Sequence, residues 1–226
     1  MSIEAIKKAV GYKAAEFVQS GMNVGLGTGS TAFYFIERLT LRCKEGLKIH
    51  AVASSEKSLR QAKEGGIPLL DIDQITSLDL TVDGADEIDP QKRMIKGGGG
   101  ALIREKILAS MSREMIVIVD ETKLVPALGK NKLPVEILSF AKNATLHRIA
   151  KAGFQGEFRK NTDGSLYITD NQNLIVDIHF KSLREKPEED HEELRSIPGV
   201  VDTGFFFDLA GRVVVGFKDG QVVIKP

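Results

Sequence analysis

Residues 23–31 read Asn-Val-Gly-Leu-Gly-Thr-Gly-Ser-Thr, and their pattern is the first indication of the fold class. Residues 23–27 have the apolar character of a short buried strand, whereas residues 30–39 follow the spacing of a helix. The glycines between them permit a tight turn, because a residue without a Cβ adopts backbone conformations that are closed to others. The stretch therefore predicts a strand, a tight turn and a helix.

The same alternation of strand and helix extends to both sides of this unit. Helices are predicted at residues 3–19, 55–63 and 101–110, and strands at residues 48–53, 67–70, 78–82 and 115–119. Mostly continuous apolar strands that alternate with helices are typical of a parallel sheet covered on both faces.

The pattern changes near residue 131. Strands are predicted at residues 134–140, 156–160, 166–169, 174–180 and 200–207, and helices at residues 143–152 and 187–195. This order is close to a β-α-β-β-α-β sandwich. Two last strands, at residues 212–217 and 221–224, are expected to return to the edge of the first sheet.

The whole chain has 226 residues, with 31 Lys and Arg against 31 Asp and Glu, and 42% of its residues are hydrophobic. The charge balance argues against a nucleic-acid partner, and the composition supports a folded core. No apolar run approaches the roughly 18 residues of a membrane span, and residues 1–8 open an amphipathic helix instead of a signal peptide. We expect a cytoplasmic protein without a membrane partner.

The single cysteine, Cys43, has no partner for an internal disulfide.

The turn formed by Thr28, Gly29, Ser30 and Thr31 is the first candidate binding segment. Its hydroxyl groups and the free N–H groups at the start of the next helix suit an anion such as a phosphate. An ordinary tight turn is the alternative. The spacing is GxGxG and not GxGxxG, and no acidic residue ends the next strand to hold a ribose, so a nicotinamide ligand is disfavoured.

A second candidate segment is Asp-Gly-Ala-Asp-Glu-Ile-Asp at residues 83–89, directly after a predicted strand. Ligands of open α/β sheets bind at the carboxyl ends of strands, so Asp83 and Asp86 are placed to meet one. A Mg²⁺ site is the alternative, although the nucleotide loop that usually accompanies such chemistry is missing. The other acids of the segment, Glu87 and Asp89, fit a solvated turn better.

The third candidate segment joins Lys96 and a run of glycines to a helix. Glu105 shares an apolar stripe of that helix with Leu102 and Ala109, and a carboxylate there is either paired or functional. Burial disfavours the charged form of the carboxylate, so the carboxylate binds a proton more readily, as a useful general base must. The partial positive charge at the nearby helix start opposes this effect. A salt bridge to a nearby cation is the alternative.

Few other residues are candidates for binding or catalysis. Lys123 follows the strand predicted at residues 115–119 and could supply charge to an anion, although on its own it would be an ordinary surface lysine. The histidines lack ligand spacing, so neither a zinc site nor Ser–His–Asp catalysis is expected.

Several motifs occur in order along nearly the whole chain. They are GLGTGST (residues 25–31), DGADEID (83–89), KGGGGALIREKI (96–107), VDETK (119–123), LPVEI (133–137), TDNQN (169–173) and IPGVVDTG (197–204). With these motifs the sequence resembles the type A ribose-5-phosphate isomerases. The resemblance implies reversible conversion of D-ribose 5-phosphate to D-ribulose 5-phosphate in the non-oxidative branch of the pentose phosphate pathway, without a metal ion or an organic cofactor.

The resemblance also implies an architecture. It is an α/β fold with a Rossmann-like main domain, built on a parallel sheet, and an inserted smaller ferredoxin-like α+β domain. We place the main domain at residues 1–131 and 206–226 and the smaller one at residues 132–205. A homodimer or a homotetramer is implied as well.

By motif, Glu105 matches the family's general base, and further positions match its substrate-binding segments. These are Thr28, Gly29, Ser30, Thr31, Asp83, Gly84, Ala85, Asp86, Lys96, Gly97, Gly98, Gly99 and Lys123. Lys7 lies where family members also place a basic residue near the phosphate. Gln172 stands where the family's usual TDNGN turn has a glycine. A glycine often supplies a positive φ at such a turn. The glutamine therefore bears on the geometry of that turn and not on the chemistry of the reaction.

An aldose–ketose isomerase moves a proton between C2 and C1 through an enediolate. We expect Glu105 to move that proton, Lys96 and backbone N–H groups to stabilise the enediolate oxygen, and Asp83 to assist ring opening or proton transfer to oxygen. Asp86 would hold sugar hydroxyls. The phosphate would rest on the turn at residues 28–31, helped by one of the two lysines at positions 7 and 123.

Two other classes of protein share parts of this pattern. A non-catalytic sensor of sugar phosphates would bind the same ligand, but such a module is normally joined to a DNA-binding helix-turn-helix, and a base on an apolar helix face is superfluous to it. A nucleotide-dependent oxidoreductase is disfavoured by the missing acid after the second strand.

Overall fold

The computed structural model describes residues 1–226, which form two compact units. The first unit comprises Met1–Ala85, Arg104–Lys123 and Leu209–Pro226, and the second comprises Asp86–Ile103 and Leu124–Asp208. Residues 86–103, 124–131 and 206–208 therefore belong to the second unit, although their sequence places them in the main domain.

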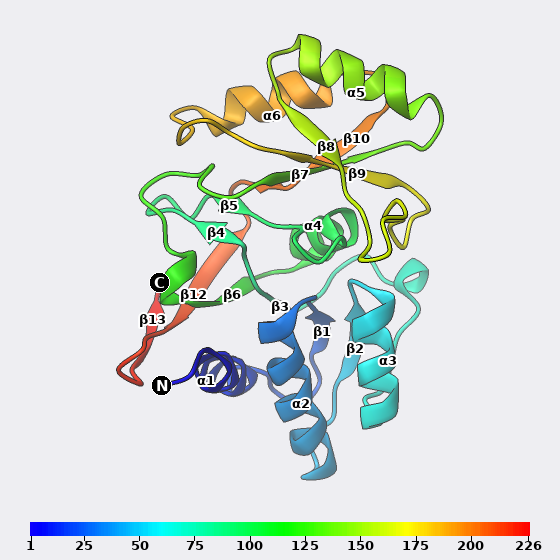
Figure 1. Ribbon diagram of the computed structural model, residues 1–226. Coiled ribbons are helices and arrows are strands. Elements are labelled where there is room, and N and C mark those ends of the chain that lie inside the picture. The colour runs from blue at the N-terminus through cyan, green and yellow to red at the C-terminus, as the bar shows by residue number, and fades with distance from the viewer. The chain divides into compact units, whose positions relative to one another are not determined.

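A six-stranded sheet forms the centre of the first unit, and Figure 1 shows its strands in the order β13-β12-β6-β3-β1-β2. The strands are β1 (Asn23–Leu26), β2 (His50–Ala53), β3 (Leu80–Asp83), β6 (Met115–Asp120), β12 (Ala210–Gly216) and β13 (Val222–Lys225). All neighbours are parallel except β12 and β13, which are antiparallel at the edge of the sheet, as the sequence predicts. The chain passes from β1 outward to β2 and then returns to β3, so the strand order reverses between β1 and β3. Crevices at such reversals, beyond the carboxyl ends of the strands, are where open α/β sheets bind ligands.

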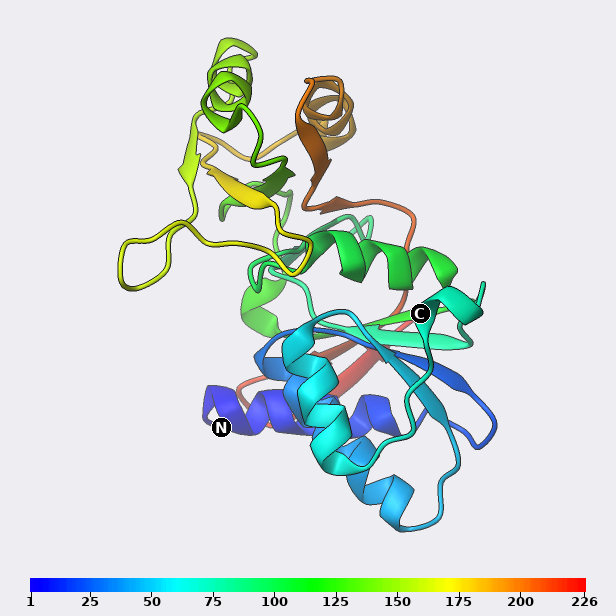
Figure 2. The ribbon, with the colours of Figure 1, turned by 90° about the vertical axis from the view of Figure 1, so that its right-hand side faces the viewer.

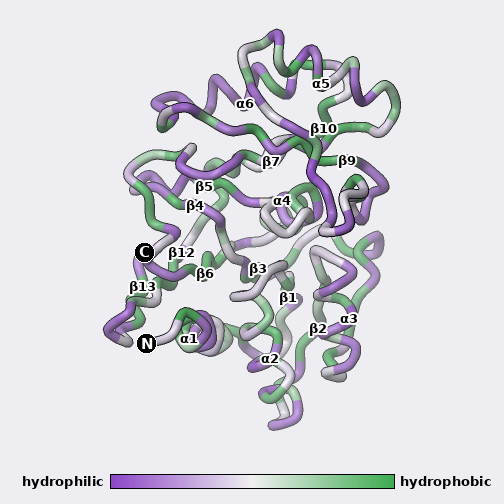
Figure 3. The backbone as a smooth tube through the Cα atoms, viewed as in Figure 1, coloured by the Kyte–Doolittle hydropathy of each residue, from purple (hydrophilic) through white to green (hydrophobic).

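Helices cover both faces of this sheet. They are α1 (Ile3–Ala15), α2 (Ser30–Lys44), α3 (Glu56–Gly65) and α4 (Leu102–Met111). Ala51 packs in the apolar cluster that contains residues of α1, α2 and α3, whereas its neighbour Val52 packs with Leu108 of α4. Successive strand residues point to opposite faces, so α4 lies on the face opposite the other helices. Figure 3 shows the apolar character of the buried strand β6, and none of the helices is long and apolar enough to cross a membrane.

The second unit contains a four-stranded antiparallel sheet in the order β10-β7-β9-β8. Its elements follow the chain as β7 (Leu133–Ile137), α5 (Lys142–Lys151), β8 (Gly156–Phe158), β9 (Leu174–Ile178), α6 (Pro187–Arg195) and β10 (Val200–Thr203). This is the expected β-α-β-β-α-β order. Val135 and Val176 face Ile149 of α5 and Leu194 of α6, and Figure 2 shows the two helices on the same side of the sheet. The opposite face carries the alternate residues, and they include charged side chains.

A three-stranded sheet of the second unit was not expected from the sequence. It consists of β4 (Glu87–Ile88), β5 (Met94–Ile95) and β11 (Phe205–Phe206), in the order β11-β5-β4. The single strand predicted at residues 200–207 is consequently divided between two sheets. The division falls at Gly204, where a Cβ would lie 2.3 Å from the carbonyl oxygen of Lys96.

Two other predicted strands are wrong. Residues 67–70 and 166–169 form only isolated bridges, Ala51 with Leu69 and Lys160 with Leu166 among them. At residues 67–70 the reason is local, because Pro68 has no N–H with which to extend a ladder. Short 3₁₀ turns occur at Ile72–Gln74 and Glu121–Lys123.

Candidate active site

The candidate residues divide between the two units. Glu105, Asp83, Gly84, Ala85, Lys7, Lys123 and the turn at residues 28–31 lie in the first unit, and Asp86, Lys96, Gly97, Gly98 and Gly99 lie in the second.

The turn between β1 and α2 leaves the N-terminus of α2 open. Gly29 is the N-cap residue, with a φ of 117°, and no side chain caps this end of the helix. By contrast, Ser2 caps α1 and Ser55 caps α3 through side-chain oxygens. Gly29 and Ser30 are exposed, and the first turn of α2 contains no acidic residue. The partial positive charge of the helix end therefore faces solvent without a competing carboxylate.

Asp83 is fully buried at the carboxyl end of β3, beside this turn. Its Oδ1 accepts hydrogen bonds from Thr28 N at 3.0 Å and from Gly84 N at 2.7 Å. Close approach of the carboxylate explains the glycine at position 27, where a Cβ would lie 2.2 Å from Asp83 Oδ1. The structure thus brings Thr28 and Asp83 together at the reversal of strand order.

A group of serines that follows β2 holds the Thr28 side chain in place. Thr28 Oγ1 lies 2.8 Å from Ser54 Oγ and donates to Ser55 Oγ at 2.8 Å. Ser58 Oγ donates to the Gly27 carbonyl oxygen at 2.7 Å. These serines stand where a dinucleotide-binding strand would end in an acid, and their supporting role was not predicted. The run of small hydroxyl residues at the end of β2 was the only signal for it.

Glu105 lies in the first turn of α4 and is 3% exposed. Leu102 and Ala109, on the same helix stripe, are also buried. Leu108, three residues after Glu105, attaches α4 to the sheet because it packs against Val52 and Leu78. The predicted position of Glu105 on a buried helix stripe is confirmed.

The two remaining candidates of the first unit are Lys7 and Lys123. Lys7 forms an ion pair with Glu4 at 2.8 Å, and this hydrogen bond, with one from Tyr34, lowers the pKa of Glu4. Lys123 ends a 3₁₀ turn that Asp120 organises by accepting hydrogen bonds from the Thr122 backbone and hydroxyl groups. No hydrogen bond or ion pair joins either lysine to residues 28–31.

In the second unit, Asp86 and the glycine run form a second cluster. Asp86 Oδ2 accepts a hydrogen bond from Gly98 N at 2.7 Å. A Cβ at position 98 would lie 2.5 Å from Asp86 Oδ1, so this contact requires a glycine. Lys96 follows β5, is 2% exposed, and has its Nζ 5.5 Å from the centre of the Phe206 ring.

The expectation that Glu87 and Asp89 belong to a solvated turn is wrong. Glu87 is fully buried and accepts hydrogen bonds from the backbone N–H groups of Gly129 and Asn131. Asp89 is 5% exposed and closes its turn onto the backbone and side chain of Arg93. The two carboxylates therefore hold loops by charge-assisted hydrogen bonds. No three or more Asp, Glu, His or Cys side chains gather in a way that could hold a metal ion.

A buried glutamate explains why the LPVEI and TDNQN motifs occur together. Glu136 Oε1 accepts hydrogen bonds from Thr169 Oγ1 at 3.0 Å, from Asn171 Nδ2 at 3.2 Å and from Asn173 Nδ2 at 2.9 Å. Gln172, between the two asparagines, has a φ of 63°. It therefore adopts the left-handed conformation that a glycine favours.

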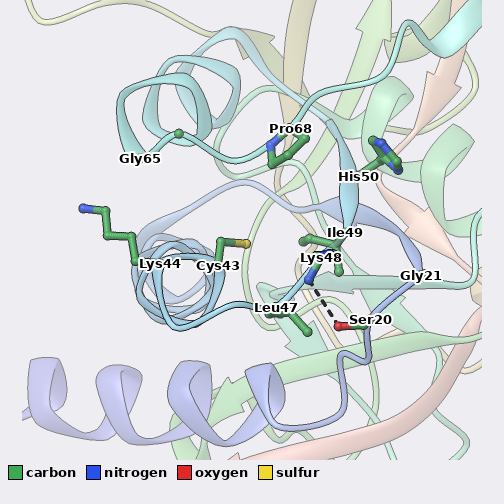
Figure 4. A pocket seen from close by; sticks show the side chains of 11 residues that line it. Ser20, Gly21, Cys43, Lys44, Leu47, Lys48, Ile49, His50, Gly65 and Pro68 are labelled. Atoms are coloured by element: carbon green, nitrogen blue, oxygen red, sulfur yellow. Dashed lines mark hydrogen bonds between the residues drawn. The ribbon is translucent and has the colours of Figure 1, made fainter.

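A cavity of about 810 Å³ in the first unit contains none of the candidate residues. It opens at the amino end of β1 and β2, the edge opposite the turn that holds Thr28. Figure 4 shows Cys43, His50 and Pro68 around it, with Lys48 N donating to Ser20 Oγ. Burial raises the pKa of the Cys43 thiol above its usual 9.0, so this cysteine is not an activated nucleophile.

Comparison with known proteins identifies the family. The model of the family "Ribose 5-phosphate isomerase A (phosphoriboisomerase A)" matches residues 50–220. The chain belongs to the ribose-5-phosphate isomerase A family. A ribose-5-phosphate isomerase A of Protochlamydia amoebophila is 56% identical over 223 residues, covering 99% of this chain and 96% of its own length. One from Streptococcus pneumoniae is 48% identical over 219 residues, covering 96% of both chains.

Solved structures of ribose-5-phosphate isomerases share the fold. That of Plasmodium falciparum has a TM-score of 0.95 and 38% identity, covering 99% of this chain and 98% of its own. Another, in complex with phospho-erythronic acid, has a TM-score of 0.94 and 38% identity, covering 100% of this chain and 99% of its own. Members of this ribose-5-phosphate isomerase family are aldose–ketose isomerases. The resemblance and the α/β fold class expected from the motifs are therefore confirmed.

Proposed function

We propose that the chain catalyses the reversible conversion of D-ribose 5-phosphate to D-ribulose 5-phosphate, a step of the non-oxidative branch of the pentose phosphate pathway. The observation that carries the proposal is the hydrogen bond between Thr28 N and Asp83 Oδ1. It joins an open helix N-terminus, suited to a phosphate, to a buried carboxylate suited to a sugar hydroxyl. The relative bound to phospho-erythronic acid supports the same class of ligand.

The phosphate anchor is assigned to the turn at residues 28–31. Gly29 and Ser30 of this turn are exposed, and no side chain caps the helix of 15 residues that begins there. We assign Lys7 or Lys123 to add a positive charge there. Binding energy from this non-reacting group would serve to hold C1 and C2 in place for proton transfer.

Proton transfer between C2 and C1 is assigned to Glu105. As a buried carboxylate on a helix that packs against the sheet, it has a fixed orientation, which a general base needs. Asp83 would assist opening of the furanose ring or proton transfer to oxygen, and Asp86 would hold sugar hydroxyls. Lys96 and backbone N–H groups would stabilise the enediolate oxygen, with no metal ion or organic cofactor in the scheme.

The decisive test is Glu105→Gln, which keeps the shape of the side chain and removes the base. Turnover of ribose 5-phosphate should fall by about 10²–10⁴-fold, and exchange of the C2 proton with solvent deuterium should fall with it. Binding of ribose 5-phosphate should persist. The control is Glu64→Gln, at an exposed position near the end of α3. Near-normal turnover in Glu105→Gln would refute the assignment.

Further measurements separate the alternatives. A sugar-phosphate sensor would bind ribose 5-phosphate and leave it unconverted in a coupled assay for ribulose 5-phosphate. Full activity is expected after exhaustive chelation, whereas a strict need for a divalent metal would revive the Mg²⁺ alternative at Asp83 and Asp86. A homodimer or homotetramer and a cytoplasmic location stay predictions, the first to be tested by light scattering.

A further inference from the structure

The glycine run after Lys96 is held by side chains that come much later in the sequence. Arg159 Nη1 donates to the carbonyl oxygen of Gly97 at 2.9 Å and to that of Gly98 at 3.1 Å. The Tyr167 hydroxyl donates to the carbonyl oxygen of Gly99 at 3.3 Å. Three consecutive carbonyls thus have side-chain partners, Arg159 directly after β8 and Tyr167 in the segment between β8 and β9.

Arg159 is itself fixed in orientation. Its Nε donates to Asp177 Oδ2 at 3.0 Å and its Nη2 to Asp177 Oδ1 at 2.5 Å, which leaves Nη1 for the loop. The guanidinium group is planar, so the bidentate pair sets the direction of Nη1. Burial alone would raise the pKa of Asp177, but hydrogen bonds from Arg159 and Lys132 outweigh this effect and lower it. The anchor is therefore a carboxylate at neutral pH.

The carbonyl contacts determine where the loop N–H groups point. In a trans peptide the C=O and N–H groups point in opposite directions. The peptide that joins Gly97 to Gly98 has its C=O on Arg159 and its N–H on Asp86. The next peptide has the Gly98 C=O on Arg159, so its Gly99 N–H points away from the guanidinium group, and both glycines are exposed.

We propose that Arg159 is a positioning residue for the isomerisation, and this inference rests on the function proposed above. By holding the Gly98 carbonyl, Arg159 presents the Gly99 N–H as a hydrogen-bond donor for the oxygen that becomes negative in the enediolate. Donors of this kind act most strongly when their direction is fixed before the reaction. A loop of glycines has no such direction of its own, because each residue has a wide choice of backbone conformations.

The test compares Arg159→Lys with Lys132→Met. Arg159→Lys keeps the positive charge but not the fork that reaches both Asp177 and the loop. Its kcat should fall by about 10-fold to 10²-fold, with little change in KM for ribose 5-phosphate. Inhibition by phospho-erythronic acid, whose carboxylate mimics the planar, charged enediolate, should weaken by a similar factor. Lys132→Met removes the other partner of Asp177 but touches no loop carbonyl, and it should keep the wild-type kcat.

Two additional variants keep the inference testable if Arg159→Lys fails to fold. Tyr167→Phe removes only the hydroxyl on Gly99 and should lower kcat more than it raises KM. Arg159→Ala should regain turnover on addition of guanidinium ion but not of methylammonium. Wild-type kcat in Arg159→Lys, or an equal loss in Lys132→Met, would overturn the positioning role. A wild-type protein that does not convert ribose 5-phosphate would instead refute the proposed function itself.

Discussion

Gly27 offers a sharp test of how closely the β1–α2 turn and Asp83 must fit. In Gly27→Ala the new Cβ would lie 2.2 Å from Asp83 Oδ1, 2.3 Å from its Cγ and 2.5 Å from its Cβ. Ordinary contact begins at 3.4 Å, so the carboxylate has to withdraw. Because the whole Asp83 side chain is too close, and not only its tip, rotation of the carboxylate does not relieve the overlap.

The expected cost follows from the hydrogen bonds at stake. Asp83 Oδ1 accepts from Thr28 N at 3.0 Å and Gly84 N at 2.7 Å, and a displacement near 1 Å in a site can cost about 10²-fold in rate. We expect kcat/KM for ribose 5-phosphate to fall by about that factor. Overpacking should also lower the free energy of unfolding by about 1–3 kcal/mol.

A coupled assay for ribulose 5-phosphate and urea unfolding together measure these effects. The matched control is Gly65→Ala, whose Cβ would lie 2.3 Å from Thr40 Oγ1, at the end of α3 that lines the cavity. It should lose stability without a comparable loss of activity. Wild-type kcat/KM in Gly27→Ala would refute the reasoning, and so would equal losses of activity in the two variants.

Two further predictions concern stability in the second unit. Gln172→Gly should raise the free energy of unfolding by about 1 kcal/mol, because Gln172 has a φ of 63°; urea unfolding that shows a loss of stability would contradict this. The pKa of Asp177 is lowered from its ordinary 3.8, so the stability that it gives is present above that ordinary value and is lost as the pH falls through the lowered one. The stability difference between the wild type and Asp177→Asn should therefore shrink on acidification, and a difference that grows toward low pH would show the sign to be wrong.

Periodicity identified most elements of the fold because their apolar residues repeat at the spacing of a helix or a strand. Helix α6 was predicted with its observed bounds, and β13 at the predicted edge of the sheet. The strands that escaped prediction, β4 and β5, have two residues each, and so does β11, which was predicted only as the end of a longer strand at residues 200–207. A two-residue strand has no period, and its pairing is set by distant parts of the chain.

The candidate site shows the same limit. Motifs marked Glu105, Asp83 and the glycine segments, because glycines and carboxylates stand out beside predicted strands and helices. The side chains that hold these segments in place could not be predicted from the sequence. Arg159 lies 62 residues from the Gly97 carbonyl that it binds, and Glu87 binds Gly129 N across 42 residues. Such roles depend on contacts across the fold, and a surface arginine or a solvated acid would have the same local sequence.

The order of strands in the first unit also bears on how the chain folds as it is made. β12 pairs with β6 in the middle of the sheet, yet it follows the whole second unit in the sequence. During synthesis the edge of β6 therefore remains without its neighbour until the ribosome has passed residue 216. Backbone groups on an open edge can pair with another chain, and domains generally fold as units while synthesis continues. The inserted unit can thus be complete before the sheet that carries it, and until β12 emerges the open edge of β6 can pair with another chain.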